Sequence, residues 1–192
     1  RPKKIIQHLK SKFGKEVVKE IEWELLSKRD LKLVHTDDYI NSLFDQATID
    51  DVIMNIYELK KDDGSFYRFN PKKKIKEFSD LFYHQHAETS GVYYCAKDSF
   101  LNNKNNFFLS GGMHHAMTDR GRGFCSLNDQ VIAIKKLQFE YGLKSAWVID
   151  LDVHKGDGTA ECTKSDKTIS TLSIHMQNGW PFDETWKPGP WD

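Results

Sequence analysis

The segment 150–154, DLDVH, sets two carboxylates and an imidazole at alternate positions, namely Asp150, Asp152 and His154. If the apolar strand predicted at residues 146–149 continues through them, the three side chains share one face, because strand side chains alternate. Such a buried row is costly unless a cation or hydrogen bonds compensate it. Carboxylate and imidazole donors suit zinc or another divalent metal. The spacing predicts a metal site at a strand end; a polar strand end with surface acids is the alternative.

Two adjacent histidines, His114 and His115, follow the glycine pair Gly111-Gly112. Imidazoles of this kind serve as general acid and base, or as metal ligands, although a His-His pair is also commonly incidental. The glycines allow the backbone to approach a substrate closely. Because the pair follows an apolar run at residues 107–109, predicted as a buried strand, it is expected on the same sheet rim as the aspartates.

The glycine-rich segment 119–125, DRGRGFC, leads into a helix that Asn128 or Asp129 caps. A phosphate-binding loop would suit that position. However, the spacing is not G-x-G-x-x-G, and no Lys-Ser or Lys-Thr pair follows. The segment is better interpreted as a loop that shapes a pocket, with Phe124 as one wall.

The elements that must position these residues follow from hydrophobic periodicity. Helices are predicted over residues 4–26 with a break or bend at Gly14, over 37–43 with Thr36 or Asp37 as the cap, over 49–59, over 88–97 and over 128–141. A short extended piece is predicted at residues 33–34, and strands at 107–109, 146–149 and 168–174. Apolar strands separated by a helix form a βαβ unit, so the fold class is α/β with a parallel sheet.

Composition limits the remaining possibilities. The chain of 192 residues predicts a single domain, 1–192, and 28 basic residues balance 28 acidic ones. A net charge of zero gives no broad attraction to nucleic acid or to an anionic membrane, and no apolar run reaches the roughly 20 residues of a membrane span. The three widely spaced cysteines argue against a disulfide framework and favour a reducing compartment: the cytoplasm, or the nucleus if the source is eukaryotic.

Taken together, three motifs resemble the histone deacetylase family of the arginase/deacetylase superfamily. They are residues 111–116 (GGMHHA), 123–125 with 128–129 (GFC, ND), and 150–154 with 156–159 (DLDVH, GDGT). Their order and spacing match, and the sequence DRG before GFC is closest to class IV and bacterial deacetylase-like proteins. The recognisable part covers roughly residues 107–182. The resemblance implies a three-layer α/β/α fold with a mainly parallel sheet, incomplete at both ends.

The same resemblance assigns roles to individual residues. Asp152 and His154 would be zinc ligands. His115 would act as general base and then as general acid, while His114 would assist electrostatically. Two aspartates would orient this pair, Asp150 holding His114 and Asp157 holding His115.

Two further sites are implied. A structural potassium ion would lie near the zinc, bound by carbonyl groups around Asp150, Asp152, His154 and Ser173. A channel for the acyl-lysine side chain would be lined by Gly123, Phe124 and Trp180.

One departure qualifies the expected activity. The family's third zinc ligand and its transition-state tyrosine come later in its sequence, and Asp166, Asp183 and Asp192 lack the surrounding motif. We therefore expect a fragment of a longer protein, without the N-terminal strand and the C-terminal third, the latter being its missing partner. The expected function of the complete protein is zinc-dependent hydrolysis of acyl-lysine amides. An amidohydrolase for acetylpolyamines or other small acetylated amines, and an inactive fragment or interaction module, are the alternatives; the isolated piece is predicted to be inactive.

Overall fold

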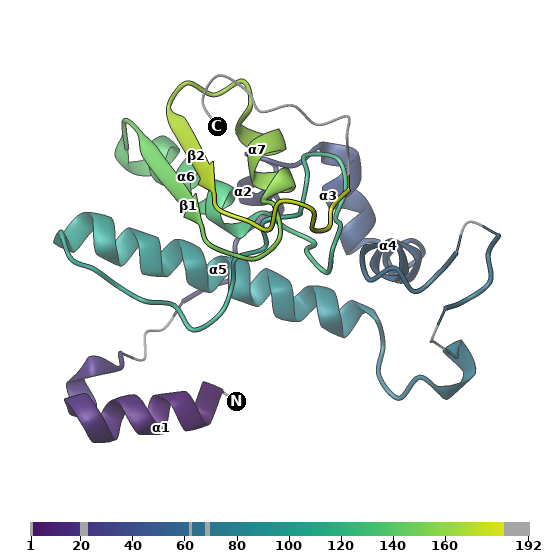
Figure 1. Ribbon diagram of the computed structural model, residues 1–192, viewed down its shortest axis with the longest axis horizontal. Coiled ribbons are helices and arrows are strands. Elements are labelled where there is room, and N and C mark those ends of the chain that lie inside the picture. Colours follow the sequence, from purple (N-terminus) through teal and green to yellow (C-terminus); the bar gives the residue numbers. More distant parts are fainter. Residues whose placement is uncertain (1, 20–22, 62, 68–69, 183–192) are drawn as a thin grey trace.

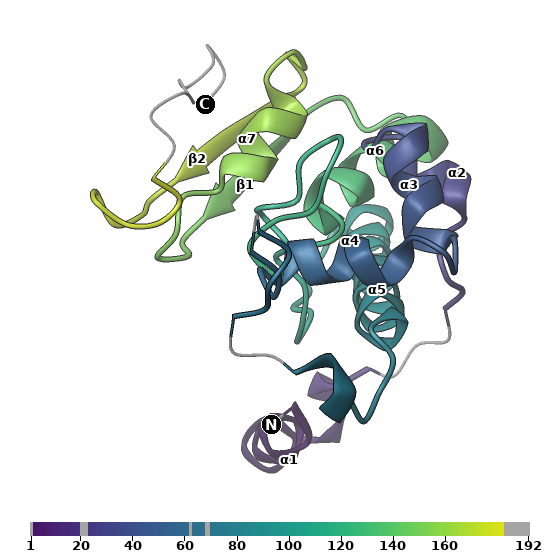
Figure 2. The same cartoon turned by 90° about the vertical axis from the view of Figure 1, so that its right-hand side faces the viewer.

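The computed structural model describes residues 2–19, 23–61, 63–67 and 70–182 (Figure 1). Its elements, in chain order, are α1 (Pro2–Phe13), η1 (Lys15–Val17), α2 (Lys28–Leu31), α3 (Asp37–Phe44), α4 (Ile49–Ile56), η2 (Pro71–Lys73), α5 (Ser79–Asn102), α6 (Asp129–Tyr141), β1 (Ala146–Asp150), α7 (Asp157–Thr163) and β2 (Ile169–Ser173). Figure 2 shows the sheet and α7 at one end of the molecule and the helices α2 to α6 at the other.

The two strands pair in parallel, as predicted, and α7 connects them in a βαβ unit. The register runs from Ala146 opposite Ile169 to Asp150 opposite Ser173. Strand residues directly across from each other share a face, so Asp150 and Ser173 lie side by side where both strands end. That edge is where open parallel sheets place their ligands.

Helices cover one face of the sheet. Val131 of α6 packs with Val148 of β1 and Ile169 of β2, and Cys162 of α7 packs against this cluster. On the opposite face Trp147 and Ile149 are 69% and 60% exposed. β1, predicted as an apolar strand, is therefore buried on one face only, because the described residues supply a helical layer on one side. Two of the three expected layers are present in the part of the chain that the structure describes.

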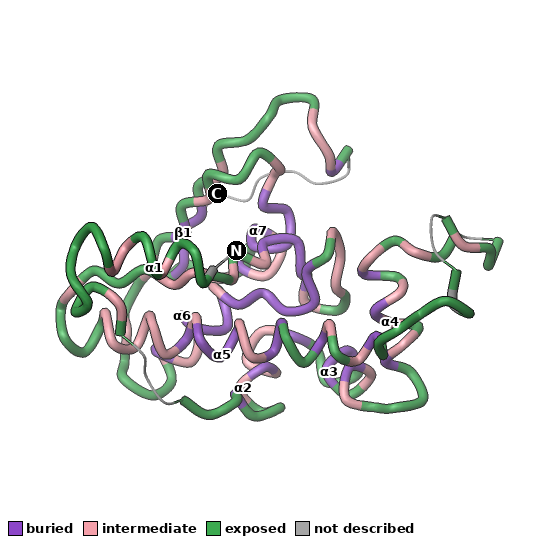
Figure 3. Tube along the Cα trace, turned by 90° about the horizontal axis from the view of Figure 1, so that it is seen from below, coloured by how far each residue is buried: buried purple, intermediate pink, exposed green. Residues whose placement is uncertain are grey.

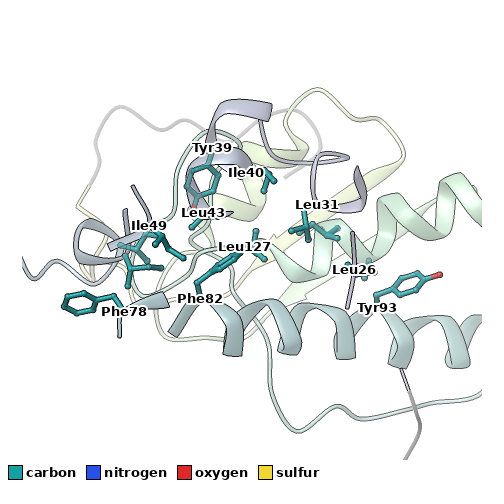
Figure 4. Close-up of a cluster of buried hydrophobic side chains, with 14 of the residues drawn as sticks. Leu26, Leu31, Tyr39, Ile40, Leu43, Ile49, Phe78, Phe82, Tyr93 and Leu127 are labelled. Atoms are coloured by element: carbon teal, nitrogen blue, oxygen red, sulfur yellow. The ribbon is translucent and has the colours of Figure 1, made fainter. Parts of the chain in front are cut away.

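The helical body is centred on α5 and α6, which pack along each other. Figure 3 shows the longest buried stretches in the segment that leads into α6 and in α7, whereas burial alternates along α5. Its core is a cluster of aliphatic and aromatic side chains from α2 to α6 (Figure 4). The largest fully buried members include Leu31, Ile40, Leu43, Ile49, Ile53, Ile56, Phe82, Tyr93, Leu127 and Ile132. This core fixes the starting point of α6, and hence the loop that precedes it.

Helix ends follow the predicted caps. The hydroxyl of Thr36 accepts the backbone N–H of Tyr39 and begins α3, and the side chain of Asn128 accepts the N–H of Val131 and begins α6. Gly142 ends α6 in the left-handed region, with φ 68°. Such a conformation favours glycine, which is why the sequence marks this helix end well.

The predicted helix over residues 4–26 is confirmed up to Phe13, and the break predicted at Gly14 is present; beyond it, the prediction of helix is wrong for the described residues 15–19 and 23–26, which form no α-helix. Gly14 takes φ 93° and ψ 164°, which stops α1. Of the residues predicted helical, 20–22 lie outside the described part of the chain. Leu26 is not helical, and side chains of α5 bind its backbone: Ser90 accepts its N–H (3.0 Å), and His86 Nε2 bonds its carbonyl (2.7 Å).

Two expected extended segments are also wrong. Residues 33–34 form turns after α2, because their N–H groups bond to the carbonyls of Asp30 and Leu31. Residues 107–109 form no strand in the described structure: Phe107 is 84% exposed, and the ring of Phe108 lies against Gly91 of α5. An apolar run becomes a strand only when a neighbouring strand accepts its hydrogen bonds. Because residues 107–109 form no strand, the helix of the βαβ unit is α7, which lies between β1 and β2. The sequence analysis predicted no helix at that position.

The three cysteines are free thiols, in keeping with the prediction of no disulfide framework. Among the described helices, none combines the length and apolar character needed to cross a bilayer.

Candidate active site

The turn before the two histidines is held by the first residue of α6. Gly111 and Gly112 have φ values of 88° and 85°, which favour glycine. The Asp129 carboxylate accepts the N–H groups of Gly112 (2.8 Å) and Met113 (3.0 Å). Burial raises the pKa of Asp129 to about 6, against the opposing effect of these N–H groups. Asp129 was expected only as a possible helix cap; here it fixes the approach to His114.

His35 holds the segment that follows the histidine pair, at Met117, and the start of α6, at Asn128. Its Nδ1 bonds the carbonyl of Met117 (2.8 Å), and its Nε2 accepts the N–H of Asn128 (3.0 Å). Nε2 can accept only if the ring is neutral and Nδ1 carries the proton. Burial lowers the pKa of His35 to about 4, although the neighbouring carbonyls oppose this shift. The sequence reasoning gave His35 no special role, because its partners lie far along the chain.

Each histidine of the pair is bonded to one aspartate. Nδ1 of His114 lies 2.5 Å from Oδ2 of Asp150, the last residue of β1. Nδ1 of His115 lies 2.6 Å from Oδ1 of Asp157, the first residue of α7. These are the two pairs expected from the sequence, and the imidazole centroids are 3.9 Å apart. A carboxylate on Nδ1 selects the tautomer with its proton there and leaves Nε2 as the free basic nitrogen.

The carboxylate of Asp150 favours the protonated form of His114. Burial alone would lower the pKa of His114, but the hydrogen bond and charge of Asp150 outweigh it, so the pKa lies above its ordinary value. Correspondingly, burial would raise the pKa of Asp150, but the hydrogen bond from His114 prevails and lowers it. His114 is therefore suited to electrostatic support of a developing negative charge.

Asp152 and His154 lie beside the histidine pair, but not in a strand row. β1 ends at Asp150, and the chain bends, so the predicted inward row of residues 150, 152 and 154 is wrong as strand geometry. Asp152 Oδ1 accepts the backbone N–H of His154 (2.8 Å) and bonds its Nδ1 (2.9 Å). The same oxygen is 3.7 Å from Nε2 of His114, and the rings of His154 and His115 are 5.9 Å apart.

Asp152 and His154 are of the right chemical type to bind a metal ion, but two side chains are fewer than a catalytic metal site needs. A carboxylate oxygen and an imidazole nitrogen are ordinary zinc donors, but catalytic zinc usually has three protein ligands. Within the described ranges, no group of three or more His, Cys, Asp or Glu residues could hold a metal ion. Asp166 is engaged elsewhere, in an ion pair with Lys135, and Asp183 and Asp192 lie outside the described residues. The described residues thus supply part of a metal site.

Of the three expected channel residues, Gly123 and Trp180 lie against His115, whereas Phe124 packs elsewhere. A Cβ added to Gly123 would lie 2.5 Å from the Trp180 ring and 2.8 Å from His115, so glycine permits this contact. The rings of Trp180 and His115 meet edge to face, with centroids 4.6 Å apart. Phe124, at φ 67° and 58% exposed, packs instead on Tyr57 (5.4 Å).

Gln85 of α5 holds this loop in place. Its Nε2 donates to the carbonyl of Phe124 (2.6 Å) and to the hydroxyl of Tyr57 (3.1 Å), and its Oε1 accepts the N–H of Ser126 (2.9 Å). Gln85 and its neighbour His86 are both buried. The specific role of Gln85 carried no signal in the sequence.

Ser173 lies next to the expected zinc-binding segment. It pairs with Asp150 across the strands, and its hydroxyl accepts the N–H of Gly156 (3.2 Å). The carbonyl of Asp150 accepts the N–H of Ile174 (2.9 Å) and keeps a second lone pair. The assignment of these residues to a potassium site stays a prediction.

Comparisons with known proteins identify the family of the chain. Over residues 1–188 the chain matches the histone deacetylase domain. The acetoin utilization protein AcuC of Bacillus subtilis is 30% identical over 166 residues, which are 84% of this chain and 39% of AcuC. An uncharacterized protein of Picosynechococcus is 43% identical over 72 residues, 38% of this chain and 24% of that protein.

Solved structures give the same result. The crystal structure of an HDAC homolog from Aquifex aeolicus superposes with a TM-score of 0.69 at 25% identity and covers 95% of this chain and 47% of that one. An HDAC homolog complexed with SAHA gives 0.68 at 26% identity, with the same coverage. The chain spans less than half the length of these relatives. Its arginase/deacetylase-like α/β fold, its motifs and its match over residues 1–188 lead to one conclusion: the chain belongs to the histone deacetylase family.

Proposed function

We propose that the full-length protein is a zinc-dependent deacetylase that hydrolyses short acyl amides of lysine side chains. The observation that supports this most strongly is the pair of imidazoles, each bonded through Nδ1 to a different carboxylate and placed beside Asp152 and His154. Acid–base hydrolysis of an amide needs such groups, one to move protons and one to steady charge. AcuC relatives and the SAHA-bound homolog support the same class of activity.

Asp152 and His154 would supply two zinc ligands. Zinc bound there would polarise the amide carbonyl and lower the pKa of an attacking water. Nε2 of His115 takes the proton of that water and later delivers it to the leaving amine. Asp157 keeps Nδ1 of His115 protonated and the ring in place, while His114 stabilises the negative charge that develops on the former carbonyl oxygen. Gly123, Phe124 and Trp180 line the path of the aliphatic lysine stem. Carbonyls around Asp150, Asp152, His154 and Ser173 would bind potassium.

The test is His115→Ala in the full-length protein, assayed with an acetyl-lysine peptide and zinc. Removing a general acid–base group should lower kcat by about 10²- to 10⁴-fold. His84→Ala is the matched control, because His84 is exposed on α5. An unchanged kcat in His115→Ala would refute the assignment. Running acetylated polyamine in parallel decides whether small amines replace lysine peptides as the substrate.

For the 192-residue chain taken alone, we infer weak zinc binding and little catalysis, because the described residues bring only Asp152 and His154 to the site. Calorimetric titration with zinc at neutral pH measures this directly. Tight binding of one ion per chain would contradict the inference.

A further inference from the structure

The carboxylate that orients His115 is also bonded to an arginine. Oδ1 of Asp157 bonds Nδ1 of His115 (2.6 Å), and Oδ2 accepts from Nη1 of Arg122 (3.0 Å). The Asp157 side chain is 2% exposed, so its charge needs a compensating partner. Arg122, from the glycine-rich loop, supplies a guanidinium at the oxygen that His115 does not use.

The same guanidinium lies over the indole of Trp180, 5.0 Å from the ring centroid. The ring of Trp180 packs edge to face with that of His115. Arg122 therefore contacts two of the groups that confine the His115 ring: the carboxylate at its Nδ1 and the indole of Trp180.

The backbone fixes Arg122 in this position. Its N–H donates to the carbonyl of Cys125 (3.0 Å), and its carbonyl accepts the N–H of Cys125 (2.8 Å). These bonds close a tight loop around Gly123 and Phe124. The Arg122 side chain is thus fixed at its backbone and at its planar guanidinium group, so it loses little further conformational freedom when it binds Asp157.

The neighbouring pair is built differently. Oδ2 of Asp150 bonds His114, whereas its Oδ1 accepts the backbone N–H of Asp152 (2.9 Å). The second carboxylate oxygen is thus bound by a main-chain amide in Asp150 and by a charged side chain in Asp157. The two His–Asp pairs are distinguished by this partner.

We propose that Arg122 is a positioning residue that acts on His115 through Asp157 and Trp180. It prevents the carboxylate from rotating away from Nδ1 and holds the indole against the imidazole. Without it, a buried carboxylate loses its cation and reorients, so His115 Nδ1 loses a fixed partner. This inference rests on the proposed function for its kinetic consequence, but the contacts are independent of that function.

The experiment compares Arg122→Met and Arg122→Lys with Arg120→Met. Arg120 is a matched control, because it lies in the same loop but pairs with exposed Asp119 (2.8 Å). In the full-length protein with an acetyl-lysine peptide, Arg122→Met should lower kcat by about 10- to 100-fold, the usual effect of losing an outer-shell partner, with KM changed by less than about 3-fold. Arg122→Lys should recover part of kcat, and Arg120→Met should match the wild type.

A second measurement needs no turnover. In the metal-free protein at one fixed pH, NMR of ¹⁵N-labelled histidine should show a low-field Nδ1 proton for His115, assigned by its loss in His115→Ala. That resonance should broaden or vanish in Arg122→Met, persist in Arg122→Lys and Arg120→Met, and leave the His114 resonance unchanged. If Arg122→Met does not fold, Arg122→Lys carries the test through an intermediate loss of kcat.

Wild-type kcat in the folded Arg122 variant, an equal loss in Arg120→Met, or an unaltered His115 resonance in Arg122→Met would each overturn the proposal. If the wild-type protein itself does not release acetate from the peptide, the proposed function fails, and the NMR comparison still decides whether Arg122 positions His115.

Discussion

Acidification should destabilise the protein through His35, and the structure gives the size of the effect. The ring is 2% exposed and must stay neutral, because its Nε2 accepts the N–H of Asn128 while Nδ1 bonds the carbonyl of Met117. Its pKa is about 4 in the folded protein against an ordinary 6.5. Below pH 6.5 His35 binds a proton in the unfolded chain but stays neutral in the folded protein. The free energy of unfolding therefore falls as the pH drops from about 6.5 to about 4.

At roughly 1.4 kcal/mol for each tenfold difference in proton affinity, the full effect is about 3 kcal/mol, of which about 2 kcal/mol is lost between about pH 7.5 and pH 5. Denaturant unfolding at these two pH values measures it, with His35→Gln as the reference, since an amide can donate and accept at the same places without titrating. The wild type should lose about 2 kcal/mol more than the variant over this interval. Equal losses would show that His35 is not held neutral by the fold.

Three further predictions concern stability. Leu43→Ala removes a fully buried side chain from the core and should lower the free energy of unfolding by about 2–5 kcal/mol in denaturant titration. Asn128→Ala removes the α6 cap and two buried bonds, to the Ala116 carbonyl and the Thr159 hydroxyl, and should cost about 2–3 kcal/mol; a loss under about 0.5 kcal/mol would contradict that accounting. Gly158→Ala places a methyl group 2.5 Å from the Ala116 carbonyl oxygen, and should cost about 1–3 kcal/mol and lower the Tm.

Local patterns predicted what local interactions decide. The caps at Thr36 and Asn128 and the glycine that ends α6 act within one helical turn, so their signals lie in adjacent residues. β1 and β2 were found for a related reason: their apolar runs are short and bounded by polar turns. Residues 107–109 carried a similar pattern without a partner strand among the described residues, and they stay irregular.

Tertiary partners explain the rest of the misses. The DLDVH spacing correctly gathered the residues but assumed a continuing strand, whereas Asp152 folds back to cap His154. Gln85 reaches Ser126 across 41 positions, and His35 reaches Asn128 across 93. A buried glutamine or histidine at such a distance gives no periodic signal, because its partners are chosen by packing rather than by spacing.

The candidate active site lies at the interface between the helical body and the βαβ unit. Its activity is therefore coupled to the stability of the fold. The helical body supplies the histidine loop, and the βαβ unit supplies Asp150 and Asp157. The carbonyl of His114 accepts the N–H of Thr159 in α7 (3.0 Å), one residue beyond the glycine that touches the backbone of His115. A shift of α7 therefore breaks this backbone bond and the His115–Asp157 alignment together. Substitutions at this interface should lower activity and stability in parallel, whereas Leu43→Ala, in the hydrophobic core of the helical body, should lower stability alone.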